Sequence, residues 1–306
     1  FSVILSDNFK NETTMLHTMK LHYRRYVFIF FLAIALALTL SSLSVPVGNK
    51  VIQYYNNVEI NWTDQIIVAK ATGKPFVSES GTPLDTSTYE ILSVNNARSR
   101  AIEEAKDRAT ESLITALQII QVDPIRSLGD CIQSDDYTQM QLGMYPNNIK
   151  YSFKPDGAIA TQCTAMLPMG RLLKLLPEAL PAKDIPQLPG KLPSTDYSGL
   201  IVDTRGQHFS PMLFPSLFAE DGTEIFGKNF IDSRDAYVYG TVAYCFSDDV
   251  AMHHKKAGKN PYYCAALRLY NRCPVIANTD LKKILASSVT RNNLKKGNII
   301  IIIDRD

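Results

Sequence analysis

The sequence has 306 residues, with 32 basic and 30 acidic side chains and a formal net charge of +2 at neutral pH. Four of the basic and two of the acidic residues lie in 1–44, so the rest of the chain carries equal numbers of both signs. A balanced charge argues against general nucleic-acid binding, and it leaves association with a partner surface free of strong self-repulsion.

The beginning of the sequence has the pattern of an export signal. Met19 is a candidate start, and basic residues within 20–25 precede an apolar run over 27–40. Small residues follow, and we expect a secretory signal peptide that is cleaved close after Ser44. The alternative is an uncleaved N-terminal anchor, which would be the chain's membrane contact. In both cases the protein is exported, to the periplasm, the outer membrane or the cell surface.

Residues 45–175 are predicted to form a first α+β domain. The stretch 57–71 is rich in β-branched residues and alternates in polarity, so we expect one strand there. Further along, 149–153 and 158–166 flank Pro155-Asp156-Gly157, a turn signal that predicts a β-hairpin. This order of elements implies one helix covering an antiparallel sheet.

The longest helical pattern in the sequence covers 96–121. Its apolar positions recur at three- and four-residue steps: Ala97, Ala101, Ala105, Ala109, Leu113, Ala116, Leu117 and Ile120. Ser93 or Asn95 is placed to cap the start, and Asp123-Pro124 to end the helix. Because small residues let a helix approach closely, we expect a core helix pressed along strands, without a catalytic group on its buried face.

A proline-rich segment over 176–196 separates this domain from the rest. Its five prolines are Pro177, Pro181, Pro186, Pro189 and Pro193. Such a composition is typical of an extended, semi-rigid linker. We therefore expect a second domain over 197–306.

The second domain is predicted to be another sheet with one or two covering helices. The expected strands cover 200–203, 212–219, 223–226, 237–246, 262–269 and 274–277, and the expected helices cover 248–256 and 280–288. Five consecutive Ile residues at 299–303 require burial on both faces, which predicts a central strand. The fold class is therefore α+β, with two small sheet-plus-helix domains joined by the linker.

Two passages resemble a known family. One is Trp62-Thr63 with Ala71-Thr72-Gly73, followed by the Ala- and Arg-rich helix; the other is YSGLIVDTRGQHFSPMLFPSLFAEDGTEIFG at 197–227, followed by the Ile-rich strand and Asp304. Together they resemble exported relatives of the twenty-kilodalton outer-membrane lipoprotein family, which includes the flagellar basal-disc protein FlgP. The resemblance implies a non-enzymatic envelope protein that assembles into rings, discs or other oligomers. The chain lacks a lipid-attachment cysteine after the apolar run, which argues against anchoring through lipid.

Asp203, Arg205 and His208 form the one tight polar group, directly after the strand expected at 200–203. Binding groups often follow strands, and an Asp–Arg pair can orient a loop or bind an anionic group. We interpret the pair as a salt bridge that holds the turn, with Gly206 supplying a permissive φ. A binding site is the alternative.

Other chemical signals are weaker. His253 and His254 do not share a helix face, so we interpret His-His-Lys-Lys at 253–256 as a solvated surface and expect no metal site. The sequence contains no Gly-rich phosphate loop, no GxSxG and no HExxH, so we expect no cofactor.

The five cysteines all lie beyond residue 130: Cys131, Cys163, Cys245, Cys264 and Cys273. Export permits disulfides, and an odd number leaves at least one thiol without an intrachain partner. We expect one bond between Cys131 and Cys163 and one among the last three cysteines. Free thiols throughout are the alternative.

These observations favour a non-enzymatic exported protein with a structural or assembly role in the cell envelope, with a flagellum or another appendage as a candidate setting. The expected partners are further copies of the chain and other envelope or appendage proteins, bound through exposed strand edges and the helix face. No nucleic acid is expected. Two alternatives stay open: an envelope enzyme that uses Asp203, Arg205 and His208, and a ligand-binding module with an apolar cleft between the domains.

Overall fold

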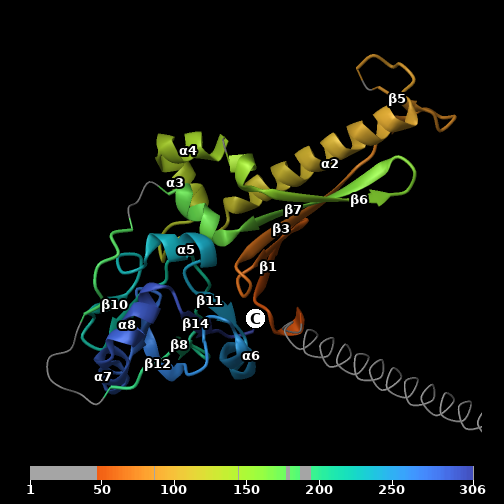
Figure 1. Cartoon of the computed structure of the whole chain (residues 1–306). Coiled ribbons are helices and arrows are strands. Elements are labelled where there is room, and N and C mark those ends of the chain that lie inside the picture. Colours follow the sequence, from red (N-terminus) through yellow and green to blue (C-terminus); the bar gives the residue numbers. More distant parts are fainter. Residues whose placement is uncertain (1–46, 86, 144, 177–179, 187–193, 306) are drawn as a thin grey trace, which may run out of the picture. The chain divides into compact units, whose positions relative to one another are not determined.

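The computed structural model describes residues 47–306 except 86, 144, 177–179, 187–193 and 306 (Figure 1). The predicted signal peptide, or its alternative as an anchor, lies outside these residues. Within the described part, no helix is long and apolar enough to cross a membrane. Two large sheets with accompanying helices, and a small two-stranded sheet, make up the described part of the fold, which confirms the expected α+β class.

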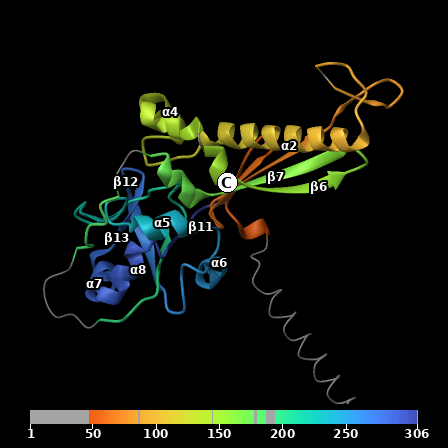
Figure 2. The ribbon, with the colours of Figure 1, turned by 45° about the horizontal axis from the view of Figure 1, so that its top comes forward.

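The first sheet has five antiparallel strands in the order β1-β2-β3-β7-β6. Its strands are β1 (Ile52–Tyr55), β2 (Val58–Asn61), β3 (Ile66–Gly73), β6 (Lys150–Asp156) and β7 (Ala160–Pro168). The expected hairpin is formed by β6 and β7, although Pro155 and Asp156 belong to the strand and the turn covers 157–159. Helix α2 (Val94–Leu117) lies along one face of this sheet (Figure 2).

The apolar face of α2 is buried as the sequence predicted, because its small residues let the helix lie close to the sheet. The eight residues predicted for this apolar face, of which Ile120 lies just beyond the end of the helix, have no exposed surface. The contact is so close that a Cβ atom at Gly73 of β3 would lie 2.0 Å from the carbonyl oxygen of Ala101. Ser93 caps the helix by accepting a hydrogen bond from the Asn96 N–H. The helix ends at Leu117, earlier than predicted, because the chain turns toward the bridge between Gln121 and Ser127.

The single strand predicted at 57–71 is wrong, since β2 and β3 are separated by a tight turn. Asn61 accepts a hydrogen bond from the Asp64 N–H through its side-chain oxygen at 2.8 Å. Gln65 adopts a φ of 59° and donates its side-chain N–H to the Trp62 carbonyl at 2.9 Å. Side chains hold this turn, which contains neither Gly nor Pro.

Shorter elements complete the first domain. They are η1 (Val47–Asn49), β4 (Phe76–Val77), β5 (Pro83–Leu84), α3 (Leu128–Ser134), α4 (Asp136–Gly143), η2 (Tyr145–Asn148) and η3 (Met169–Lys174).

The second sheet has seven strands in the order β10-β9-β13-β12-β8-β14-β11. The strands are β8 (Leu200–Asp203), β9 (Leu217–Ala219), β10 (Glu224–Phe226), β11 (Ala243–Cys245), β12 (Tyr262–Tyr270), β13 (Cys273–Ile276) and β14 (Ile299–Ile302). The helices are α5 (Ser233–Tyr239), α6 (Asp248–His253), α7 (Asn278–Ala286) and α8 (Ser288–Lys295). Strand β8 runs parallel to both of its neighbours, β12 and β14.

The Ile-rich segment forms an interior strand, as predicted. Strand β14 lies between β8 and β11, and all four of its residues are fully buried. A continuous apolar run is what a strand covered on both faces requires.

Two strand predictions in this domain are corrected. Residues 237–246 do not form one strand, because α5 continues to Tyr239 and only 243–245 are extended. Asp232 caps α5 by accepting the Arg234 N–H, and Gly240, with a φ of 72°, ends it. The strand predicted at 212–219 is reduced to β9, and α8 was not predicted.

Residues of the first domain cover the outer edge of the second sheet. Lys50 forms an isolated bridge with Cys245 of β11. The Tyr244 N–H donates to the Trp62 carbonyl at 3.3 Å, and the Thr63 hydroxyl donates to the Tyr244 carbonyl at 2.6 Å. The Trp62 and Tyr244 rings meet edge to face, with centroids 5.8 Å apart. The β11 edge is therefore closed within the chain.

The segment near the linker contacts the second domain. A Cβ atom at Gly170 of η3 would lie 2.5 Å from the carbonyl oxygens of Ala236 and Tyr237 in α5, so η3 and α5 pack backbone to backbone. A hollow of about 330 Å³ lies beside them, with Leu180 and Tyr237 among its lining residues. Of the linker itself, Lys183 donates its backbone N–H to the Asn229 carbonyl at 2.8 Å.

Candidate functional site

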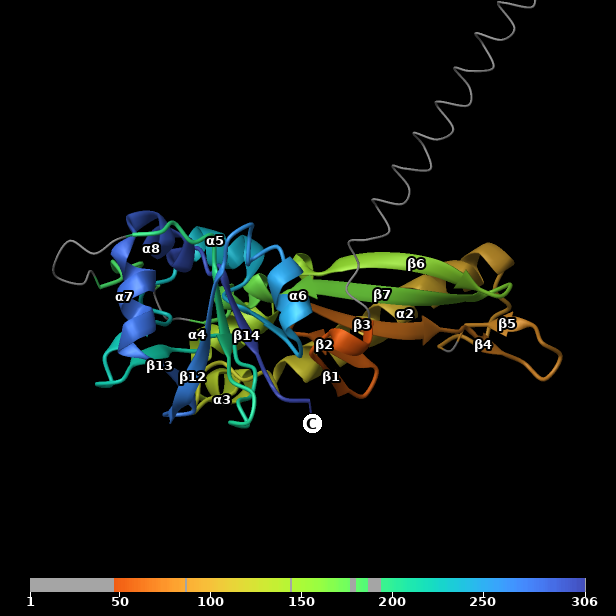
Figure 3. The same cartoon turned by 90° about the horizontal axis from the view of Figure 1, so that it is seen from below.

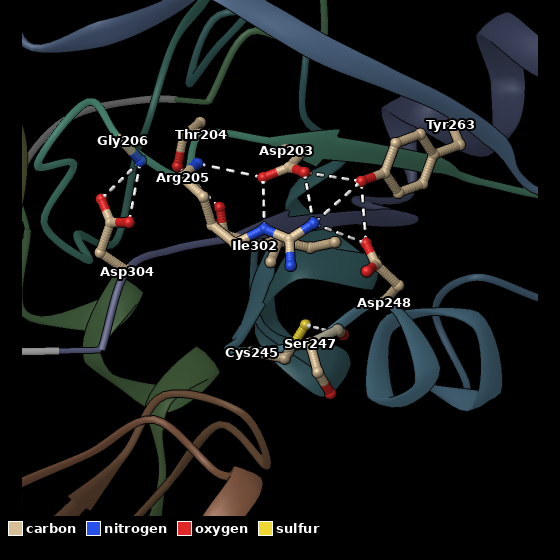
Figure 4. A network of polar contacts seen from close by, with 10 residues as sticks. All are labelled: Asp203, Thr204, Arg205, Gly206, Cys245, Ser247, Asp248, Tyr263, Ile302 and Asp304. Carbon is tan, nitrogen blue, oxygen red and sulfur yellow. Dashed lines mark hydrogen bonds and ion pairs between the residues drawn. The ribbon is translucent and has the colours of Figure 1, made fainter.

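The polar group predicted after β8 lies where several parallel strands of the second sheet end (Figure 4). Asp203 is the last residue of β8, and Arg205 follows it in the turn. Tyr263 comes from the neighbouring strand β12, and Asp248 is the first residue of α6. The structure thus adds Tyr263 and Asp248 to the residues that the sequence singled out.

Arg205 holds the two carboxylates together. Its Nε and Nη2 donate to the two oxygens of Asp203, at 2.9 and 2.6 Å, and Nη2 also donates to Asp248 Oδ1 at 2.9 Å. The hydroxyl of Tyr263 lies 2.7 Å from Asp203 Oδ2 and 2.8 Å from Asp248 Oδ1. A bidentate guanidinium–carboxylate pair of this kind is strong and fixes geometry as well as charge.

The bonds also fix the charge states. Burial alone would raise the pKa of Asp203, but bonds from Arg205 and Tyr263 outweigh it and lower that pKa to about 2. Hydrogen bonding to Asp203 raises the pKa of Arg205 further above its usual value. Burial, and then the two carboxylates, raises the pKa of the Tyr263 phenol. None of these three groups titrates near neutral pH, where a general acid or base works best.

His208 does not join this group through its ring. Its φ is 53°, and its backbone N–H donates to Asp304 Oδ2 at 3.3 Å. The Gly206 N–H, with a φ of 82° at that residue, donates to both oxygens of Asp304 at 2.8 and 2.9 Å. Asp304 directly follows the Ile-rich strand, so it fastens the turn after β8 to the end of the chain.

These contacts favour the structural interpretation of the pair. The side chains of Asp203, Arg205 and Asp248 are 16%, 38% and 54% exposed, so the group lies at the surface. Its charged atoms bind one another and join β8, β12 and α6. Among the described residues, no group of three or more His, Cys, Asp or Glu side chains is placed to hold a metal ion.

A second polar cluster corrects the expectation that 253–256 form a solvated surface. His253 is exposed, but His254 and Lys256 are 9% and 4% exposed. Lys256 Nζ donates to three carbonyl oxygens, of Gly240 at 3.1 Å, Thr241 at 3.3 Å and Gly297 at 2.9 Å. Burial lowers the pKa of Lys256 to about 7. The ammonium thus ties the end of α5 to the turn before β14.

His254 connects this cluster to the first domain. Its Nε2 lies 3.2 Å from the Thr63 carbonyl oxygen, and its Nδ1 accepts the Lys256 backbone N–H at 3.2 Å. This pattern requires the neutral ring with its proton on Nε2. Burial lowers the pKa of His254 to about 4, in agreement with that state.

The disulfides expected from the sequence are not formed. Cys163, Cys245, Cys264 and Cys273 are buried thiols, so neither the bond from Cys131 to Cys163 nor one among the last three exists. The last three face different backbone groups: Cys245 donates to the Ser247 carbonyl, Cys264 to the Ile201 carbonyl, and Cys273 accepts the Ser216 N–H. Burial raises the pKa of Cys245 and of Cys264 to about 12, which makes these thiols unreactive.

The first sheet presents a different kind of surface. Strand β6 is an edge strand of this sheet, and no described strand pairs with its outer side (Figure 3). Six of its seven residues are exposed, among them Phe153 at 44%. An exposed edge strand offers unpaired backbone groups to another chain.

A family model described as the second domain of Treponema pallidum Tp0624 matches residues 199–305. The matched segment begins just before β8 and ends after β14, so it contains the second sheet with its helices. No curated protein matches the chain. The match covers this part of the chain alone, and it gives no support to the resemblance to the twenty-kilodalton lipoprotein family.

Proposed function

We propose that this chain is a non-enzymatic, exported protein of the bacterial cell envelope, and that it acts by being assembled with copies of itself and with other envelope or appendage proteins. The observation that carries the proposal is the open edge of the first sheet at β6. Natural proteins usually shorten, cover or pair such edges, or blunt them with lysine and proline. Strand β6 carries Lys150, Lys154 and Pro155, yet its seven residues still offer unpaired backbone groups to a partner of matched sequence.

The surface polar group supports the same proposal. In an enzyme, Asp203 and Arg205 would face a substrate with free hydrogen-bonding capacity. In this chain they bind each other, Tyr263 and Asp248 at 2.6–2.9 Å. We therefore assign this group to holding the turn after β8.

The finer placement, as a relative of FlgP in a ring- or disc-forming assembly, rests on the sequence resemblance. Its first passage includes Trp62 and Thr63, which contact the second domain, and the start of its second includes β8. These residues have structural roles that a shared fold would preserve.

Cell fractionation and electron microscopy of the full chain test the proposal. We expect the protein in the envelope fraction, and rings, discs or filaments in images of the purified chain. A protein that stays in the cytoplasmic fraction and gives only single small particles at high concentration contradicts it. An enzyme activity that Asp203→Ala abolishes while circular dichroism is unchanged would favour the enzymatic alternative.

A further inference from the structure

The alternation of backbone hydrogen bonds along the strands of the first sheet shows which backbone groups of β6 have no partner strand. In an antiparallel sheet, each residue directs its N–H and C=O toward one neighbour, and successive residues alternate. The Met169 N–H donates to the Gln65 carbonyl, so odd-numbered residues of β7 bond to β3. Even-numbered residues of β7 then bond to β6, where they face the even-numbered residues of that strand.

It follows that Tyr151, Phe153 and Pro155 direct their backbone groups to the open edge. A second contact gives the same parity: the Lys70 N–H donates to the Asn57 carbonyl, which places even-numbered residues of β3 toward β2. Pro155 fits this arrangement, because a proline is tolerated in a sheet where its nitrogen faces away from the ladder.

The sequence of β6 is complementary to itself in the antiparallel direction. When Phe153 is placed opposite Phe153 of another copy, Lys150 stands opposite Asp156, Tyr151 opposite Pro155 and Ser152 opposite Lys154. The two ends of the strand thus carry opposite charges on the same face, and its centre carries an exposed aromatic ring. Cross-strand pairs of opposite charge and of aromatic residues are those that stabilise antiparallel sheets.

We propose that β6 pairs with β6 of a second copy about a twofold axis at Phe153, which joins two first sheets into one. This deepens the proposed function, on which it rests, by naming the partner and the register. The Phe153 N–H groups donate to the opposite Phe153 carbonyls, and each Tyr151 N–H donates to the opposite Pro155 carbonyl. Pro155 has no N–H, so the opposite Tyr151 carbonyl receives no backbone hydrogen bond at either end of the pair.

Twofold axes at Pro155 or Tyr151 give fewer backbone hydrogen bonds or fewer charge pairs than the axis at Phe153. A twofold axis at Pro155 places two residues without donors opposite each other at the centre. An axis at Tyr151 places Lys150 opposite Ser152 and leaves Asp156 without a partner. The axis at Phe153 pairs all seven residues of the strand and matches both charged ends.

A charge exchange tests the register. Lys150 and Asp156 are six positions apart on one strand, a separation of about 20 Å, so they do not pair within one chain. Lys150→Glu places like charges opposite each other at both ends, and Asp156→Lys does the same with the opposite sign. We expect each single variant to weaken dimerisation about tenfold, and the double variant Lys150→Glu/Asp156→Lys to restore it.

Analytical ultracentrifugation of the full chain, in a mild detergent that keeps the apolar run at 27–40 from driving association, measures these constants. Lys70→Glu is the matched control, because Lys70 is exposed on the same face of the sheet but lies in the interior strand β3. We expect less than about a twofold change for it. Phe153→Pro removes the central donors and is expected to abolish dimerisation, with circular dichroism as the check on folding.

The proposal is overturned if the parent chain is monomeric, or if the single charge variants dimerise as well as the parent. It is also overturned if the double variant is no better than the single ones. Rings or filaments that persist in Phe153→Pro would leave the assembly function standing and remove only the β6 pairing. A double variant that dimerises again, in a chain that is absent from the envelope fraction, would support the β6 pairing and contradict the envelope function.

Discussion

Strands β11 and β6, each at one edge of a large sheet, have opposite surroundings. The second sheet buries its Ile-rich strand β14 between two neighbours, and its outer strand β11 is covered by residues of the first domain. The first sheet buries one face under α2 and leaves β6 open at its edge. The comparison separates two tasks, because apolar burial in the second sheet supplies stability while the open edge of the first is available for association.

The largest expected effect is a loss of stability from a cavity in the second sheet. Ile301→Ala removes a fully buried side chain from β14 and should lower the free energy of unfolding by about 4 kcal/mol. Met166→Ala, at a 39% exposed position of β7, is the matched change in the first sheet and should cost about 1 kcal/mol or less. Urea denaturation followed by circular dichroism measures both. Equal losses would remove the distinction between the two sheets.

Lys256→Met should have the next largest effect. The substitution keeps a similar volume but leaves the carbonyls of Gly240, Thr241 and Gly297 without their donor, at a cost of about 3 kcal/mol. The exposed neighbour Lys255 is the control, and Lys255→Met should change stability by less than about 0.5 kcal/mol. A stable Lys256→Met variant would show that the three bonds contribute nothing.

Lys256 also predicts how stability depends on alkaline pH. Burial lowers its pKa in the folded chain to about 7, whereas an unfolded lysine titrates near 10.4. Between these values the unfolded chain binds more protons, so this residue makes stability rise with pH across that window. The rise should be absent in Lys256→Met, and denaturation midpoints between pH 7 and 10 would show it.

Asp203→Asn should cost less, about 2 kcal/mol at neutral pH. The folded pKa of Asp203 is about 2 against an ordinary value of 3.8, so its contribution is present above about pH 4 and is lost as the pH falls toward 2. The variant should lose this acid dependence. Asp249→Asn, at an 85% exposed side chain of α6, is the control and should behave as the parent. An unchanged acid profile in Asp203→Asn would contradict the assignment.

The smallest effect is expected at the open edge. Lys150→Glu should change the unfolding free energy of the monomer by less than about 0.5 kcal/mol, because the side chain is exposed. The measurement belongs at protein concentrations low enough to keep the chain monomeric. A large loss would mean that Lys150 stabilises its own sheet, and its effect on dimerisation would then have another cause.

The sequence revealed those elements whose residues repeat at the period of the structure. The alanines of α2 recur at helical steps, and the Ile run of β14 has the continuous apolarity of a covered strand, so both were predicted. Asp203 and Arg205 were found for a similar reason, since the two residues that bind each other are neighbours in the chain.

Other features depend on contacts that no local pattern contains. The turn between β2 and β3 is held by the side chains of Asn61 and Gln65 instead of by Gly or Pro. The burial of Lys256 could not be predicted from a local pattern, because its acceptors come from segments 15 and 41 residues away. Helix α5 is a different case, because Asp232 and Gly240 are recognisable caps, although the residues over 237–246 alternate as a strand does.

Trp62 is the one tryptophan of the sequence, and it lies where the first domain meets Tyr244 of the second. Its intrinsic fluorescence therefore reports on a single joint, without any label. Opening of that joint would bring water to the indole and shift its emission to the red, whereas pairing at β6, which β3 and β7 separate from β2, would leave the spectrum unchanged. The chain thus carries an optical signal that distinguishes separation of its domains from assembly of its copies.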